Sequence, residues 1–309
     1  MKTSTSKRLR WNVAIWLAAG LFMTSTAGMA SGPILPDPKA EARHQPQVEE
    51  TANGIPLVNI TAPSSGGVSR NEYETFNVPD KGAILNNSYT LSKTELAGYV
   101  QGNNNMAERP AKIIVNEVTG AGSTSMDGFL EVAGNRADVV IANPNGITVN
   151  GGGFINTGKA FLTTGKPVYD GEDHLQRFDI TGGDILIEGK GLGGKETESL
   201  AILSRAVKIN AGIWAKDLHI TTGANTVDAK TLEASAIEGK GGRPAFALDT
   251  AAIGGMYAGR ITLVGTEKGL GVNNSGTWSA EDNLTLDWNG DLKNSGTIYS
   301  KGNTDLRAS

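Results

Sequence analysis

Metal or acid–base chemistry in this sequence would have to come from its carboxylates and its three histidines. One histidine, His174, follows Asp170, Glu172 and Asp173, and a cluster of such oxygen ligands could bind Ca²⁺. The cluster lacks the full spacing of a calcium-binding loop, so a solvated acidic loop is the favoured interpretation. We predict no metal site here.

Cleavage of a polysaccharide would need two convergent carboxylates, or a calcium site beside a basic group. The sequence offers acids in its second half, but no spacing places a pair of them together on neighbouring elements. We therefore predict no catalytic residue and no cofactor, and a secreted β-helical polysaccharide lyase is kept as the enzymatic alternative. The acids considered are Asp184, Glu188, Asp217 and Asp228.

A strict turn motif, Asn-Pro-Asn-Gly-Ile, is the strongest local signal. Its first asparagine can accept a backbone N–H two residues on, proline presets φ at the second position, and glycine suits the fourth. Apolar β-branched runs at 139–142 and 147–149 flank it, so we expect a corner between two strands and not a two-residue hairpin. Taken alone, the motif is simply a good β-turn. Its residues are Asn143, Pro144, Asn145, Gly146 and Ile147.

This motif, with Asn-Gly-Gly-Gly-Phe-Ile-Asn-Thr at 150–157, resembles the second signature of the two-partner secretion domain. That domain opens filamentous haemagglutinins, contact-dependent inhibition exoproteins and related cytolysins. The family's first signature, Asn-Pro-Asn-Leu, has a degenerate counterpart here, whose turn we expect to be less preorganised because asparagine replaces proline. The counterpart residues are Asn103, Asn104, Asn105 and Met106.

The resemblance covers about residues 54–271 and implies both fold and function. It implies a right-handed parallel β-helix that is recognised by the periplasmic POTRA domains of a dedicated outer-membrane β-barrel transporter. The chain would cross that membrane unfolded and fold outside the cell. The two Asn motifs could contact the transporter or nucleate folding, and the sequence leaves both alternatives open.

The role of the full-length protein is also left open between adhesion and contact-dependent inhibition. Either role would use a receptor on a host or neighbouring cell, bound through chain that follows Ser309. A cytolysin is less favoured, because some cytolysins of the family carry Cys-x-x-Cys where this chain has Val-Asn-Gly-Gly at 149–152.

Residues 1–30 have the pattern of a secretory signal peptide. Four basic residues precede an apolar run at 13–23 that is too short to span a bilayer, and small residues at 28–30 suit cleavage before Ser31. We therefore expect Sec export, periplasmic transit and a secreted or cell-surface location in a Gram-negative bacterium. The basic residues are Lys2, Lys7, Arg8 and Arg10.

The charge and the cysteine content agree with export. Of the 28 basic residues four lie in the signal, which leaves 24 against 32 acidic ones and a net charge of −8. So acidic a chain argues against nucleic acid as a partner. The chain has no cysteine, which suits a large regular core that crosses a second membrane unfolded.

The rest of the chain predicts an all-β fold with one polar segment before it. Residues 31–53, which include His44, lack an apolar period and are expected to be a flexible leader. From residue 54 short β-branched runs alternate with Gly- and Asn-rich corners. We assign 54–271 to the secretion domain, with an N-terminal β cap within 54–110, and 272–309 to the start of filamentous repeats.

A repeat near the end of the chain indicates the architecture. Asn-Ser-Gly-Thr at 274–277 recurs at 294–297, a step of about 20 residues per coil that is typical of a β-solenoid. Coils stacked about 4.8 Å apart would place equivalent asparagines above one another, where their amides can bond. On the order of a dozen coils could follow residue 54. The leucines and isoleucine expected to point inward are Leu284, Leu286, Leu292, Ile298 and Leu306.

Overall fold

The computed structural model describes residues 32–106 and 109–308. The expected signal peptide, residues 1–30, therefore lies outside the described residues. Within the described ranges the chain is almost wholly β, with two short 3-10 helices. No helix there is long and apolar enough to cross a membrane.

The strands form three parallel ladders, which we call A, B and C. Ladder A contains β4 (Val68–Phe76), β8 (Ile113–Val118), β11 (Ala137–Ala142), β14 (Thr157–Thr163), β19 (Ser199–Ser204), β21 (Gly212–Thr222), β25 (Gly255–Gly265), β28 (Leu284–Trp288) and β31 (Thr304–Ala308). Ladder B contains β3 (Pro56–Asn59), β5 (Ala83–Asn87), β10 (Phe129–Gly134), β13 (Gly152–Ile155), β18 (Leu192–Gly194), the first halves of β21 and β25, β27 (Thr277–Ala280) and β30 (Thr297–Ser300). Ladder C contains β9 (Thr124–Met126), β12 (Ile147–Val149), β17 (Asp184–Ile187), β20 (Ala206–Ile209), β24 (Phe246–Thr250), β26 (Gly271–Asn274) and β29 (Leu292–Asn294).

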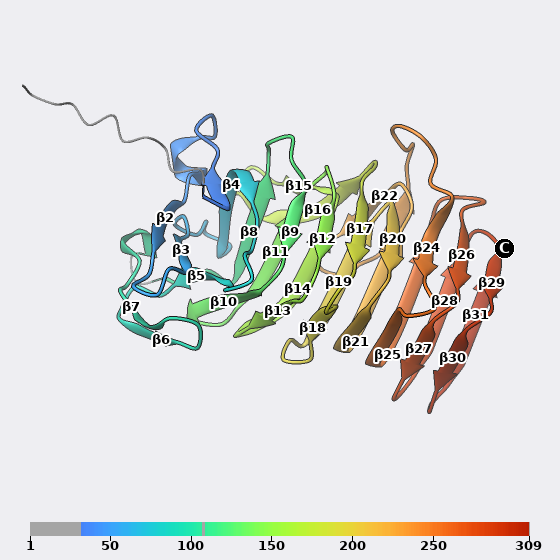
Figure 1. Ribbon diagram of the computed structural model, residues 1–309. Coiled ribbons are helices and arrows are strands. Elements are labelled where there is room, and N and C mark those ends of the chain that lie inside the picture. The colour runs from blue at the N-terminus through green and yellow to red at the C-terminus, as the bar shows by residue number, and fades with distance from the viewer. Residues whose placement is uncertain (1–31, 107–108, 309) are drawn as a thin grey trace, which may run out of the picture. The chain divides into compact units, whose positions relative to one another are not determined.

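Each coil visits the ladders in the order C, B, A before the chain climbs to the next coil (Figure 1). The strands β21 and β25 are long because each continues from ladder B into ladder A, as their pairings on both ladders demonstrate. Successive strands on each ladder are parallel and hydrogen-bonded. The predicted parallel β-helix is therefore confirmed.

The coil step confirms the repeat found in the sequence. Leu286 lies opposite Leu306, and the Asn274 amide donates to the Asn294 Oδ1, 20 residues on, at 2.8 Å. The same Asn274 accepts the Gly276 N–H at 3.1 Å, so its side chain ties the corner as well as the neighbouring coil. Insertions lengthen other coils, and ladder A accordingly holds fewer coils than the dozen we expected.

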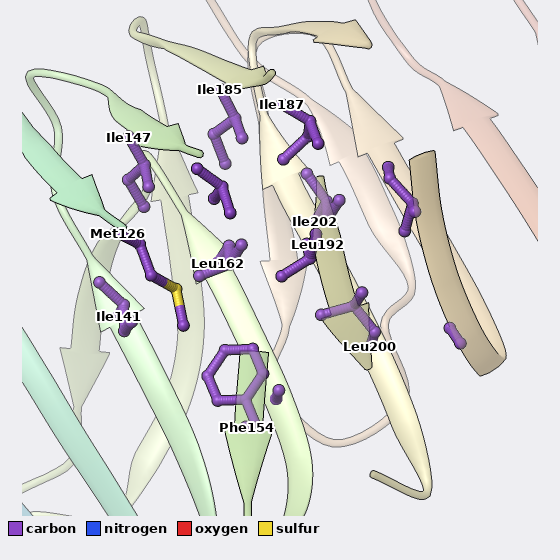
Figure 2. Packing of buried hydrophobic residues seen from close by; sticks show 14 of the residues in the cluster. Met126, Ile141, Ile147, Phe154, Leu162, Ile185, Ile187, Leu192, Leu200 and Ile202 are labelled. Carbon is purple, nitrogen blue, oxygen red and sulfur yellow. The ribbon is translucent and has the colours of Figure 1, made fainter. Parts of the chain in front are cut away.

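The core lies between the ladders and is built from in-register aliphatic rows. In ladder A the row runs from Ile141 through Leu162 and Ile202 to Ile220, each opposite the next. Figure 2 shows Ile141, Leu162 and Ile202 together with ladder C residues in the same interior. Of the five residues expected to point inward, Leu284 and Leu286 are fully buried and Leu292 and Ile298 partly buried, whereas Leu306 is 45% exposed in the final strand.

Two hairpin insertions leave the coils at the corner between ladders A and C. They form an antiparallel sheet of β15 (Lys166–Tyr169), β16 (Leu175–Ile180), β22 (Asn225–Asp228) and β23 (Ala234–Ala236). This side sheet buries Phe178 and Val227 against the outer face of ladder A, where Val140 and Phe161 complete a second apolar cluster. The middle strands of ladder A, β8 to β19, are thus buried on both faces.

The segment expected to be a flexible leader is residues 31–53, and its described residues, 32–53, are instead folded as part of the cap. Strand β1 (Ile34–Pro36) pairs antiparallel with β4, and β2 (Gln47–Glu50) pairs antiparallel with β3. The 3-10 helix η1 (Ala42–His44) joins them, and the hairpin of β6 (Ser92–Thr94) and β7 (Gly98–Val100) adds to the cap. Backbone pairing explains why this prediction was wrong. The first coil would otherwise be an open sheet edge, and polar strands can supply the hydrogen-bond partners that its backbone groups need.

A buried charged cluster attaches the cap to the first coils. His44 from η1 lies 3.0 Å from Glu72, whose carboxylate also accepts the Arg70 guanidinium at 2.8 Å. Arg70 Nη2 lies 3.4 Å from Glu117 on the next coil, and the guanidinium stacks 4.4 Å from the Tyr169 ring centroid. One arginine therefore joins cap, two coils and side sheet.

Replacing Arg70 with methionine should lower the free energy of unfolding by about 3 kcal/mol. The change leaves two carboxylates without their cation in a buried site, and the lower end of the usual range applies because Arg70 is partly exposed. The control Arg177→Met removes an exposed ion pair with Asp179 and should cost less than about 1 kcal/mol. Urea unfolding measures both, and equal losses would contradict a special role for Arg70.

Lowering the pH from 7.5 to 5.5 should destabilise the protein, and His44→Gln should reduce that loss. Burial and the neighbouring Arg70 lower the pKa of His44 below 6.5. His44 therefore stabilises the fold fully only at pH values above its unfolded-state pKa. This stabilisation is lost as the pH falls from there through the lower pKa of the folded state.

The groups facing His44 are Arg43, Arg70, Glu72 and Asp173. Burial also lowers the pKa of His219, but this residue is present in both proteins and cancels from the comparison. Chemical denaturation at the two pH values gives the result. An unchanged pH dependence in His44→Gln would rule out this residue as a source.

Candidate functional site

The Asn-Pro-Asn-Gly motif forms the predicted type of turn at the corner between β11 and β12. The Gly146 N–H donates to the Asn143 carbonyl at 3.1 Å, and the Asn145 N–H donates to the Asn143 Oδ1 at 2.9 Å. Gly146 has φ +111°, and a Cβ there would lie 3.0 Å from the Asp184 carbonyl oxygen of the next coil. Glycine is thus required by both conformation and space.

The two asparagine amides of this turn bind the corner of the preceding coil. The Asn143 Nδ2 donates to the Gly122 carbonyl at 2.9 Å and to Thr124 Oγ1 at 3.0 Å. The Asn145 Nδ2 donates to the Gly120 carbonyl at 2.8 Å. The Thr124 N–H in turn donates to the Gly146 carbonyl at 3.0 Å, so hydrogen bonds run in both directions between the turn and the start of β9.

The degenerate motif makes the same turn in the N-terminal part of the helix. The Asn105 N–H donates to Asn103 Oδ1 at 3.0 Å, and the Met106 N–H donates to the Asn103 carbonyl at 3.2 Å. The Asn103 amide donates to the carbonyls of Ile60 at 2.8 Å and Asn86 at 2.9 Å. The 3-10 helix η2 (Asn104–Met106) is this turn.

The two turns share one division between buried and exposed residues. Asn143 and Asn103 are buried, with every amide group hydrogen-bonded. The first turn ends in the buried side chain of Met106, and the second is followed by the buried side chain of Ile147. The tip residues Pro144 and Asn145 are exposed, as Asn104 is in the first turn. The first asparagine therefore builds the corner, and only the tips are accessible.

The next coil packs directly on the second turn. Gly183 has φ +78°, and a Cβ there would lie 2.7 Å from the Pro144 carbonyl oxygen. A shallow groove runs beside the turn, lined by Asn145, Thr148, Asp184 and Lys208 among others. The turn is thus clamped between the coil before it and the coil after it.

The other candidates from the sequence are occupied by local structure. Asp170 accepts the N–H groups of Glu172 and His174, both at 2.9 Å, and Asp173 pairs with Arg43 at 2.8 Å. These bonds hold the loop in its conformation. Among the described residues no group of three or more His, Asp and Glu side chains could hold a metal ion.

Two of the four candidate lyase acids, Asp217 and Asp228, are likewise used in structural contacts. Asp217 pairs with Arg260 at 3.2 Å on the adjacent strand. Asp228 accepts the N–H groups of Lys230 and Thr231 at 2.9 and 2.7 Å, which lowers its pKa.

Sequence reasoning missed the buried asparagines that line the first coils. The Asn87 amide donates to the carbonyls of Ala111 at 2.9 Å and Asn135 at 2.8 Å, and the Asn116 amide donates to the Val140 carbonyl at 3.1 Å. Both asparagines lie inside strands that otherwise consist mainly of apolar residues. That contrast, a polar amide in an apolar run, is the signal that could have identified them.

Comparison with known proteins gives a consistent result. The family model described as the TPS secretion domain matches residues 33–298. The Toxin CdiA of Yersinia pestis is 43% identical over 298 residues, which is 89% of this chain and 9% of that protein. The 16S rRNA endonuclease CdiA of Enterobacter cloacae is 44% identical over 91% of this chain and 8% of that protein. The chain thus spans less than a tenth of the length of these relatives.

A solved structure agrees with the sequence comparisons. The crystal structure of a filamentous hemagglutinin secretion domain superposes with a TM-score of 0.76 at 30% identity. The match covers 90% of this chain and all of that one. The described coils, with their cap and side sheet, therefore correspond to a secretion domain as a whole.

Replacing Asn143 with alanine should lower the free energy of unfolding by about 1–3 kcal/mol, because the buried Thr124 hydroxyl loses its donor and the turn loses the bond from the Asn145 N–H. Asn145→Ala is the matched control, and with its exposed amide it should cost less than about 1 kcal/mol. Urea denaturation of both variants tests this difference. If Asn145→Ala were as damaging as Asn143→Ala, the assignment of the first asparagine as the structural one would be wrong.

Proposed function

Because this chain belongs to the TPS secretion domain family, we propose that it is the export and folding-nucleation module of a longer exoprotein. Members of this family are secreted or cell-surface proteins of Gram-negative bacteria. In the proposal, periplasmic POTRA domains of an outer-membrane β-barrel transporter recognise the module. The chain then passes through unfolded, after Sec export directed by residues 1–30, and folds on the cell surface.

The architecture supports a role in folding during export. Each coil pairs with the coils next to it in the stack. A chain that emerges N-terminus first can therefore add one coil at a time to the coils that have already folded. The cap protects the first coil, which would otherwise be an open edge. Folding outside the membrane would then favour forward movement of the chain.

The burial of Asn143 is the observation that carries our assignment of the Asn motifs. Its side-chain oxygen and nitrogen both bond within the folded chain, and the residue has no exposed surface. Asn103 is bound in the same way. We assign the two turns to folding nucleation, with the transporter contact made elsewhere on the module.

Contact-dependent inhibition is the favoured role for the full-length protein. The curated relatives named CdiA are 43–44% identical to this chain, compared with 30% for the filamentous hemagglutinin domain. Any toxic activity and any receptor contact would reside in chain beyond residue 309, and this module would carry no catalytic residue. Adhesion is the alternative, and a C-terminal toxin in the full reading frame would decide between the two.

Secretion through the cognate transporter tests the proposal. We expect the chain to reach the medium only when the transporter is present, and retention with an active transporter would refute it. Export of Asn143→Ala should fall several-fold, in step with its lost stability.

Asn145→Ala provides the matched comparison, because it alters the exposed tip and leaves the corner intact. We expect its export to stay near that of the parent chain. Loss of export in Asn145→Ala at unchanged stability would instead identify the turn as a transporter contact.

A further inference from the structure

A row of aromatic side chains runs along the outer face of ladder B. Successive in-register pairings place Phe129 opposite Gly153, Gly153 opposite Gly193, and Gly193 opposite Trp214. The strands that carry this row follow one side of the coil stack in Figure 1, from β10 to β30. The row continues through Tyr257 and Ser279 to Tyr299.

The rings lie flat on the sheet because glycines stand beneath them. A Cβ on Gly153 would lie 2.4 Å from the Phe129 ring, and one on Gly212 would lie 2.5 Å from the Trp214 ring. A Cβ on Gly255 would likewise lie 2.8 Å from the Tyr257 hydroxyl. Any larger residue at these glycines would push the ring away from the sheet, so the sequence is built to present ring faces outward.

The ring faces remain accessible although the rings are held in place. Phe129 is 44% exposed, Tyr257 39% and Tyr299 51%, and Trp214 is half-buried. The planes of the Trp214 and Tyr257 rings are nearly parallel, 16° apart, and their ring centroids are 6.2 Å apart. The side sheet covers the middle strands of ladder A, and the cap hairpin covers β5 and β10 of ladder B, whereas Trp214, Tyr257 and Tyr299 lie on later strands of ladder B that neither element covers. Exposed aromatic rows of this kind mark binding surfaces.

The polar groups beside the row match the hydroxyl groups of sugars. Asp217 and Arg260 follow Trp214 and Tyr257 by three residues, pair with each other at 3.2 Å, and keep 35% and 56% of their side-chain surfaces exposed. A carboxylate and a guanidinium accept and donate hydrogen bonds in fixed planes. Pyranose rings present C–H groups on their faces, which suit the negative face of an aromatic ring, and hydroxyls at their edges.

Other partners fit this surface less well. A peptide strand cannot add to this face by β-augmentation, because β21 and β25 are paired on both sides. Nucleic acid would need a basic stripe, whereas Arg260 is paired with an acid.

We propose that the aromatic row of ladder B is a binding site for an extended, β-linked oligosaccharide. Trp214 and Tyr257 lie on neighbouring strands and Tyr299 lies two strands further on, past Ser279, so a chain of linked pyranose rings can stack on the three rings in turn. Asp217 and Arg260 bind hydroxyls at the edge of the sugar chain. This site is separate from the Asn turns and does not depend on how the chain is exported.

Isothermal titration of the secreted chain with chitopentaose and with cellopentaose tests the site. We expect saturable binding of at least one probe, with a change in Trp214 fluorescence, since the other two tryptophans of the described chain, Trp278 and Trp288, are buried. Trp214→Ala and Tyr257→Ala should each weaken binding about tenfold. Absence of binding by both probes would overturn the proposal.

Tyr99→Ala is the matched control, because Tyr99 is 70% exposed in the cap hairpin and lies on none of the strands that carry Trp214, Tyr257 and Tyr299. It should leave the affinity unchanged, and thermal unfolding should be the same for all three variants because the altered rings are on the surface. An equal loss in Tyr99→Ala, or unchanged affinity in Trp214→Ala, would contradict a specific site. A dimer in sedimentation that Trp214→Ala dissociates would assign the row to a second copy of the chain, and would overturn the sugar proposal.

Discussion

Parallel hydrogen bonding between successive coils is the interaction on which the other features of this structure depend. A strand in any coil has its polar backbone groups satisfied only when the coil before it is in place. Stacking in register then aligns aliphatic residues into rows and asparagines into ladders, as with Asn274 and Asn294. The cap exists for the same reason, since its antiparallel strands supply the partners that the first coil lacks.

The sequence was most informative where the repeat was short and least informative where a segment depends on distant partners. The 20-residue step predicted the pairing of Leu286 with Leu306 and the bond between Asn274 and Asn294, because both follow from stacking alone. The cap segment was wrongly expected to be flexible. Its strands are polar, and their order comes from pairing with β4 and β3 and from the contact of His44 with Glu72.

The candidate site could be predicted in its local geometry but not in its surroundings. Turn chemistry alone specified the bonds from Gly146 and Asn145 to Asn143. It could not specify that the amides reach Gly120 and Gly122, because no local pattern records which corner lies below. The first motif makes an equivalent turn without proline, so the asparagine side chain, and not the fixed φ of proline, is the common structural element.

The two hairpin insertions of the side sheet have a consequence for how such chains can vary. Both leave the coils at the corner between ladders A and C, where another coil has only the four-residue Asn143 turn. Extra length at this corner packs on the outer face of ladder A and does not disturb the register of the strands on either side. This corner can therefore accept inserted chain, which makes it a suitable graft point for a foreign peptide.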